Sequence, residues 1–143
     1  LAPDLAKQQI SLRSMFGEDP SRNLAWARSP DTAGSKDYRD HLSRATVFAL
    51  NGAPADAAKA LRQAVALNDA APEAWVALVR FLAASGEKDE AEAAATEAAK
   101  RLKASAEKGG NPTAVAVALG ACRELVDDTA TAETLYRNAL KSS

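Results

Sequence analysis

The sequence predicts an all-α fold in which antiparallel helix pairs follow one another along the chain. Alanine supplies 35 of the 143 residues, whereas only seven are aromatic. Alanine is the strongest helix former because it loses no side-chain entropy on folding. A spacing pattern that recurs three times is the second observation, and the lack of any alternating strand pattern is the third. With 47% hydrophobic and 26% charged residues, the composition is that of a globular domain.

The repeat begins at a turn residue, Gly52, Gly86 or Asp127, which ends one helix and reverses the chain. Residues five, nine and twelve positions later continue one face of the next helix. The three sets are Gly52, Ala57, Leu61 and Ala64; Gly86, Ala91, Ala95 and Ala98; and Asp127, Ala132, Tyr136 and Ala139. The first two sets lie 34 residues apart and the last two 41 apart. The seven extra residues correspond to about two helical turns, which we place in 102–110.

The elements follow from this register. Upstream of it we expect a helix over 3–16, a short helix over 22–28 that carries Trp26, and a loop over 29–35. Six helices then span 36–51, 54–68, 72–85, 87–108, 112–126 and 130–142. Pro54, Pro72 and Pro112 occupy first-turn positions, where a missing N–H is tolerated. The predicted organisation is an N-terminal helical segment, 1–35, followed by a repeat domain, 36–143.

The first helix of each pair carries its own apolar stripe: Leu42, Ala45 and Phe48; Trp75, Leu78 and Leu82; and Ala116, Leu119 and Gly120. Trp26 and Trp75 are expected to anchor the core, since the basic surface that accompanies base-stacking residues is absent.

These features resemble the tetratricopeptide repeat family over about 38–140. The resemblance is carried by Pro72-Glu-Ala-Trp-Val-Ala-Leu78 through Ala98, and by Ala132-Glu-Thr-Leu-Tyr136-Arg-Asn-Ala139-Leu140. It implies a right-handed superhelix of about three repeats, with a concave groove lined by the first helix of each pair. Departures from the family pattern occur at Arg44, Val79, Arg123 and Asp127.

In that register, the groove would be lined by Arg39, Leu42, Ser43, Thr46, Glu73, Val76, Ala77, Arg80, Val117, Ala118, Ala121 and Glu124. Most of these residues are small or apolar, which favours an amphipathic helix or a hydrophobic extended segment as the ligand. Some family members bind the C-terminal carboxylate of chaperones through basic and amide side chains. The matching positions are Leu42, Thr46, Ala77, Ala114 and Ala118, so that mode is not expected here. The chain's own N-terminal helix, or an adjacent repeat, is an alternative occupant of the groove.

Net charge and hydropathy indicate whether nucleic acid or a membrane is a partner of the chain. The formal charge is −1, without the basic surface that phosphate binding requires, so nucleic acid is not expected. The RNA-binding pentatricopeptide repeats are the main nucleic-acid alternative. No apolar run reaches membrane-spanning length. Because the chain opens at Leu1 without a targeting pattern, we expect it to be part of a longer protein, with the cytoplasm as the default compartment.

The residues that could support chemistry are few. His41 is the only histidine and lies beside Asp40, but adjacent helix residues point in different directions. Cys122 is the only cysteine, and a metal site needs three or four ligands. Neither an enzyme, nor a metal site, nor a cofactor is expected. The leading hypothesis is a protein-binding module, and the alternative is a structural spacer or homo-oligomerising segment.

Overall fold

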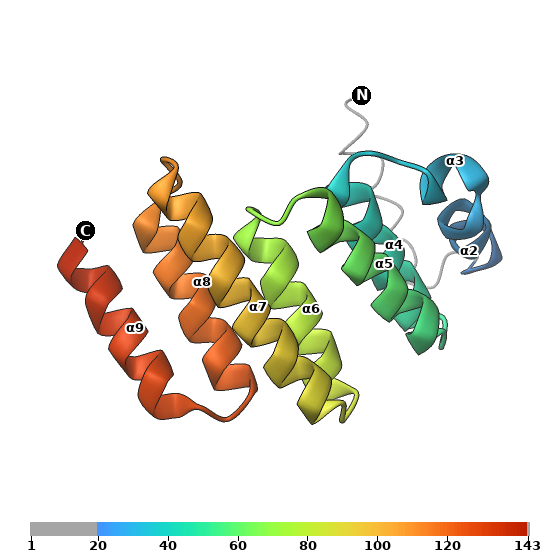
Figure 1. The fold of residues 1–143 in the computed structure, drawn as a ribbon. Helices are drawn as coiled ribbons and strands as arrows, with labels where there is room; N and C mark the ends of the chain where they lie inside the picture. The colour runs from blue at the N-terminus through green and yellow to red at the C-terminus, as the bar shows by residue number, and fades with distance from the viewer. Residues whose placement is uncertain (1–19, 143) are drawn as a thin grey trace. The chain divides into compact units, whose positions relative to one another are not determined.

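The computed structural model describes residues 20–142, which contain α-helices and no strand, so the predicted all-α class is confirmed over this range. The helices in order are α2 (Pro20–Arg28), α3 (Pro30–Ala33), α4 (Tyr38–Leu50), α5 (Pro54–Leu67), α6 (Pro72–Ala84), α7 (Lys88–Glu107), α8 (Pro112–Leu125) and α9 (Thr129–Ser142) (Figure 1). They belong to two compact units, one ending at Leu67 and the other beginning at Asn68. No helix between residues 20 and 142 has both the length and the apolarity needed to cross a bilayer.

All six predicted repeat helices are present, with ends within two residues of the expected positions. The short helix that carries Trp26 is also present, as α2. The predicted loop over 29–35 is wrong in part, because Pro30–Ala33 forms the single helical turn α3. Pro30 supplies a fixed φ at the first helical position, and this favours the turn. The helix predicted over 3–16 lies outside the described residues, and the domain division at residue 35 stays a prediction.

In the first unit, α4 and α5 form an antiparallel pair, and α2 and α3 pack against α4 (Figure 1). The buried face of α4 contains Val47 and Phe48, while α5 contributes Ala57, Leu61 and Ala64. Alanine at the closely packed positions lets the two backbones approach, and the larger side chains fill the space on either side.

In the second unit, α6 packs on both α7 and α8, and α8 packs on α9. Trp75 is 5% exposed, and its indole Nε1–H donates a 2.8 Å hydrogen bond to the carbonyl oxygen of Asp69. This bond satisfies the one polar atom that a buried tryptophan brings into a core. Trp75 is therefore the core anchor that was expected, whereas Trp26 in the first unit is partly exposed.

The three turns of the repeat share one backbone geometry. Gly52, Gly86 and Asp127 have φ values of 72°, 79° and 64°. In each turn, the N–H of the next residue donates to a carbonyl oxygen five residues earlier in the chain. The donor–acceptor distances are 2.9, 2.9 and 2.7 Å, to Phe48, Leu82 and Arg123 respectively. This is the Schellman arrangement, which ends a helix and satisfies its last carbonyls.

Each helix pair has one position on its first helix and one on its second at which a larger side chain on one helix goes with a smaller one on the other. One position lies seven residues before the turn residue and the other nine residues after it. The occupants are Ala45 and Leu61, Val79 and Ala95, and Gly120 and Tyr136. In the last pair the two positions are in direct contact, since a Cβ built on Gly120 would lie 2.5 Å from a ring carbon of Tyr136. A large residue in one helix is thus matched by a small one in its partner, which keeps the packed volume similar.

Candidate interaction surface and polar pocket

The predicted groove residues of the second unit lie on α6 and α8, two helices that pack against each other. On α6, Glu73 and Arg80 are exposed, while Val76 and Ala77 are partly exposed. The side of α6 that the register assigns to the groove is therefore apolar in its middle and charged at both ends.

On α8, Val117 holds the position equivalent to Val76 and is 48% exposed. Ala121 is partly exposed, whereas Ala118 is buried at 6% exposure and contributes to the core. Glu124 is exposed and lies near the side chain of Tyr136 on α9. Burial first, and then the neighbouring Glu124 carboxylate, raise the pKa of the Tyr136 phenol.

The remaining four predicted groove residues lie on α4, in the first unit. Arg39 is exposed and pairs with Asp37 at 3.1 Å. Thr46 is exposed, and its hydroxyl donates to the carbonyl oxygen of Leu42 at 3.2 Å. Leu42 and Ser43 are partly exposed. The structure thus brings the predicted residues together as two sets, one within each unit.

His41 is 1% exposed, and both of its ring nitrogens form hydrogen bonds within the protein. Nη1 of Arg44 lies 3.0 Å from its Nδ1, and the carbonyl oxygen of Ser35 lies 2.9 Å from its Nε2. Because a guanidinium can only donate, Nδ1 must accept, and Nε2 therefore carries the proton of a neutral ring. Asp40 is bonded to the hydroxyl of Ser35, so the adjacent histidine and aspartate serve different contacts.

Cys122 is 1% exposed, and burial raises its pKa to about 11. A thiol that is neutral at physiological pH is a poor nucleophile and metal ligand. Among residues 20–142, no three histidine, cysteine, aspartate or glutamate side chains lie close enough together to hold a metal ion.

Arg44 is the feature whose role the sequence did not reveal. It occupies the register position of Leu78 and Leu119, and it is 8% exposed. Its Nε donates to the carbonyl oxygen of Ala27 at 2.8 Å, and its Nη1 also donates to Oε1 of Gln63 at 2.9 Å. These bonds connect α2, α4 and α5. The one signal in the sequence was the departure itself, a cation at a position where the pattern requires leucine.

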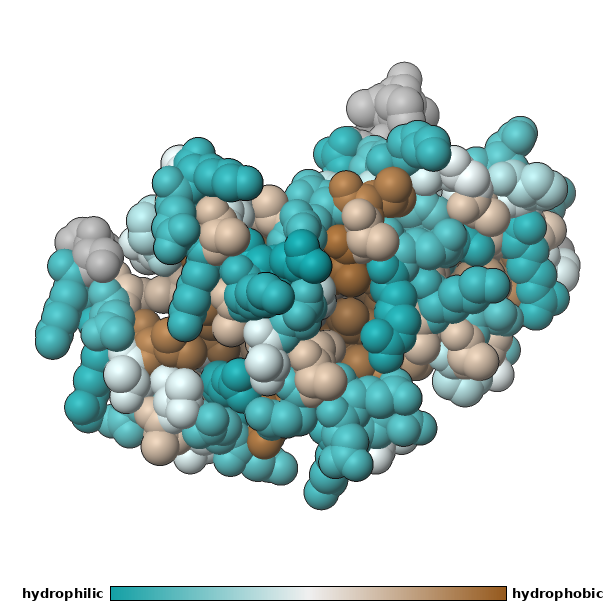
Figure 2. Space-filling model, in the orientation of Figure 1, coloured by the Kyte–Doolittle hydropathy of each residue, from teal (hydrophilic) through white to brown (hydrophobic). Residues whose placement is uncertain are grey.

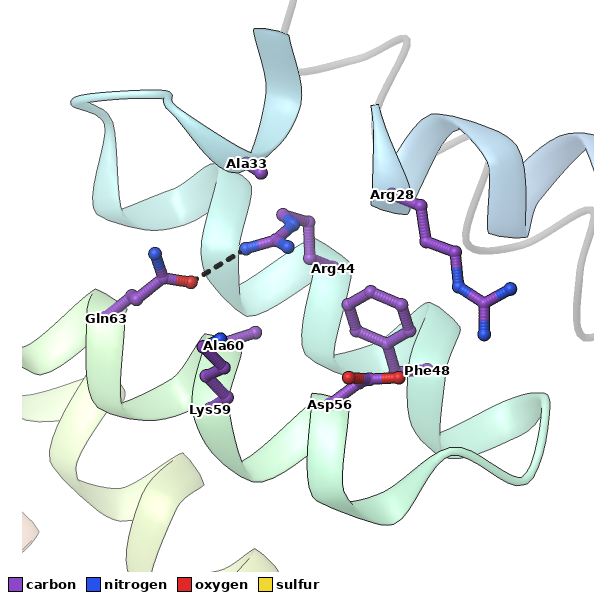
Figure 3. A pocket seen from close by; sticks show the side chains of 8 residues that line it. All are labelled: Arg28, Ala33, Arg44, Phe48, Asp56, Lys59, Ala60 and Gln63. Atoms are coloured by element: carbon purple, nitrogen blue, oxygen red, sulfur yellow. Dashed lines mark hydrogen bonds between the residues drawn. The ribbon is translucent and has the colours of Figure 1, made fainter. Parts of the chain in front are cut away.

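A cavity of about 220 Å³ lies beside this guanidinium in the first unit (Figure 3). Its lining includes two alanines together with Arg28, Arg44, Phe48, Asp56, Lys59 and Gln63. The Arg44 guanidinium carbon also lies 5.4 Å from the ring centroid of Phe48, within the range of a cation–π contact. Burial lowers the pKa of Arg44, and Asp56 acts in the opposite direction.

No known protein family matches the chain, and no curated protein matches it either. The helices, their turns and the two sets of surface residues therefore supply the functional argument.

Proposed function

We propose that the chain is a protein-interaction module of tetratricopeptide-repeat type, which binds a peptide or an amphipathic helix along the first helices of its pairs. The observation that carries the proposal is the threefold recurrence of one turn geometry, at Gly52, Gly86 and Asp127. A recurring turn gives each pair the same register, and stacked helix pairs of this kind commonly present extended binding surfaces.

Val117 supports the choice of the first helices as the binding side. Four large hydrophobic residues are exposed in the described part of the chain: Leu50, Leu67, Val117 and Leu140. Leu50 and Leu67 are the last residues of their helices, and Leu140 lies in the last turn of α9. Of these four residues, only Val117 lies in the middle of a helix. Its exposure therefore cannot be attributed to the end of a helix, where side chains are commonly exposed. Figure 2 shows that hydrophilic residues cover most of one face of the molecule, with hydrophobic residues in limited patches.

The charges around Val117 suit a peptide interface. Exposed Arg80 on α6 and Glu124 on α8 would provide a polar rim beside the apolar positions Val76 and Val117. Interfaces commonly combine an apolar centre with a polar rim, because the centre contributes desolvation energy and the rim stays solvated. The ligand would accordingly carry apolar side chains at helical or alternating spacing, with polar residues between them.

A structural spacer or homo-oligomerising segment is the second candidate, and Leu140 favours it. This side chain is 75% exposed on the last helix, α9. A neighbouring helix, from a further repeat or a second copy of the chain, would bury it. Burial of a leucine side chain contributes roughly 1.5–3 kcal/mol.

The two candidates are separated by a charge scan of the helices. The Val76→Glu, Val117→Glu double variant places two carboxylates at the proposed binding positions. The matched control is Ala93→Glu, Ala104→Glu, which adds the same charge at exposed positions of α7. Both variants should keep the helical circular dichroism spectrum of the parent chain.

Affinity capture from a lysate of the source organism, followed by measurement of binding to the captured protein, tests the proposal. We expect one partner to bind the parent and the α7 control, and to be lost with the Val76, Val117 variant. Equal binding by all three proteins would refute the proposed surface. Self-association that is abolished by Leu140→Glu would favour the oligomerising segment instead.

A further inference from the structure

The cavity in the first unit contains an arginine with unused hydrogen-bonding capacity. Nε and Nη1 of Arg44 donate to the carbonyl of Ala27, to His41 and to Gln63. Nη2 has no hydrogen-bond acceptor among the described residues, although the side chain is more than nine-tenths buried. Nη2 is not among the fully buried polar atoms without a partner, so solvent or a ligand in the cavity can reach it. A guanidinium N–H donates a strong hydrogen bond to a carboxylate, so an anion in the cavity could accept from it.

The cavity is also unbalanced in charge. Its lining contains the cations Arg28, Arg44 and Lys59 and one anion, Asp56, which gives a formal charge of +2. Arg28 and Lys59 are exposed, whereas Arg44 is buried, so the lining combines two cations at the solvent-exposed entrance with one inside the fold. Such an arrangement attracts an anion electrostatically and then offers it a directional hydrogen bond.

The walls restrict the class of anion. Phe48 and two alanines supply apolar surface, and the Arg44 guanidinium lies between Ala33 and Ala60 in Figure 3. The carboxylate of Asp56 disfavours a dianion such as phosphate, because like charges repel in a partly desolvated site. A volume of about 220 Å³ is below the roughly 300–1,000 Å³ of pockets for drug-sized ligands, so the ligand must be small.

We propose that this pocket binds a carboxylate that is attached to a short apolar stem, with Arg44 Nη2 donating to the carboxylate and Phe48 contacting the stem. Two sources share this chemistry: a small free monocarboxylic acid and an acidic side chain of a bound peptide. The site is separate from the proposed surface on α6 and α8, and it stands or falls independently of that surface.

The test is a nuclear magnetic resonance titration of the whole chain with four probes. Butanoate represents the free acid, N-acetylglutamate amide represents the peptide side chain, acetate lacks the stem, and inorganic phosphate is the dianion. We expect butanoate or the glutamate derivative to shift the Arg44 and Gln63 side-chain resonances and to bind more tightly than acetate and phosphate. If butanoate binds more tightly than the glutamate derivative, the natural ligand is a free acid; if the glutamate derivative binds more tightly, it is a peptide side chain.

Three variants locate the binding. Lys59→Gln removes an exposed entrance cation and should weaken binding about threefold, while Asp56→Asn removes the opposing charge and should strengthen it by a similar factor. Ala33→Leu fills the cavity without a change in charge and should abolish binding. Lys103→Gln removes one exposed cation from α7, in the other unit, and should leave the affinity unchanged.

Lys59→Gln should weaken binding and Asp56→Asn should strengthen it. Loss of folded protein could only weaken binding, so a gain in affinity cannot come from misfolding. Absence of shifts at Arg44 with every probe would overturn the proposal. So would shifts that persist in Ala33→Leu, or equal affinity for phosphate and butanoate, since either result would indicate only general attraction of anions to the surface.

Discussion

The contact between Gly120 and Tyr136 gives the sharpest prediction for stability. A Gly120→Ala substitution adds a methyl group in the interior of α8, and that Cβ would lie 2.5, 2.8 and 2.8 Å from three Tyr136 ring carbons. Carbon atoms prefer separations of about 3.5–4.0 Å, so the ring must move by about 1 Å.

Two opposing terms decide the sign of the effect. Replacement of a helix-interior glycine by alanine stabilises by about 0.5–1 kcal/mol, because it lowers the entropy of the unfolded chain. Overpacking typically costs about 1–3 kcal/mol, and the partly exposed Tyr136 can relax into the lower half of that range. We therefore expect Gly120→Ala to reduce the free energy of unfolding by about 0.5–1 kcal/mol.

A second background isolates the contact. In Tyr136→Ala the ring is absent, so Gly120→Ala should stabilise that variant by about 0.5–1 kcal/mol through the entropy term alone. Urea unfolding followed by far-ultraviolet circular dichroism measures all four proteins of the cycle. The coupling energy between the two sites should be about 1–2 kcal/mol. If Gly120→Ala has the same effect in both backgrounds, the two positions are not in contact and the reasoning is refuted.

Three further predictions concern the turn at Asp127, the buried Arg44 and the buried thiol of Cys122. Asp127→Gly should stabilise the chain by about 0.5–1 kcal/mol in urea unfolding, because Asp127 has a φ of 64° that glycine adopts without strain. Its neighbour Asp128 caps α9 through Thr131, so Asp128→Ala should instead destabilise by about 1 kcal/mol, and equal signs would contradict both assignments. Arg44→Met leaves a buried carbonyl and the His41 ring without a donor, which should cost about 2–4 kcal/mol; a loss below about 1 kcal/mol would show that these bonds contribute little. For Cys122, the folded pKa of about 11 lies above the ordinary value of 9.0, so the folded state retains the proton. Stability should then fall as pH rises from about 9 to 11, and the fall should be smaller in Cys122→Ala, where the raised pKa of Tyr136 still contributes.

The helices and the turns between them were predictable because local chemistry determines their ends. Glycine tolerates the positive φ of a Schellman turn, proline suits the first helical turn, and alanine permits a close helix crossing. Each of these rules acts over a few residues, so the helix ends could be placed without tertiary information. Val79 looked like an isolated departure, yet its register partner on the next helix is the small Ala95. At the equivalent positions of the last pair, Gly120 accommodates the large ring of Tyr136.

The pocket was not predictable because its contacts are not part of the repeat. Arg44 donates to Ala27, which lies on α2, seventeen residues earlier in the chain. The periodic pattern begins only after that helix and contains no information about which side of α4 it covers. From the sequence alone, the cation could be recognised only as a violation of the apolar register.

These departures explain how one repeated backbone can acquire different local properties. Where a large side chain replaces a small one, a smaller partner compensates and the core is preserved. At Arg123, which holds the register position of Phe48 and Leu82, a 2.8 Å ion pair with Glu92 accompanies the charge. At Arg44 the protein satisfies Nε and Nη1 but leaves Nη2 facing a cavity without a protein acceptor among the described residues. At Val79 and Arg123 a neighbouring side chain compensates the departure, whereas at Arg44 one guanidinium nitrogen stays available to the ligand that we propose for the cavity. The proposed carboxylate site in the first unit therefore depends on Arg44, at the position where the apolar register is interrupted.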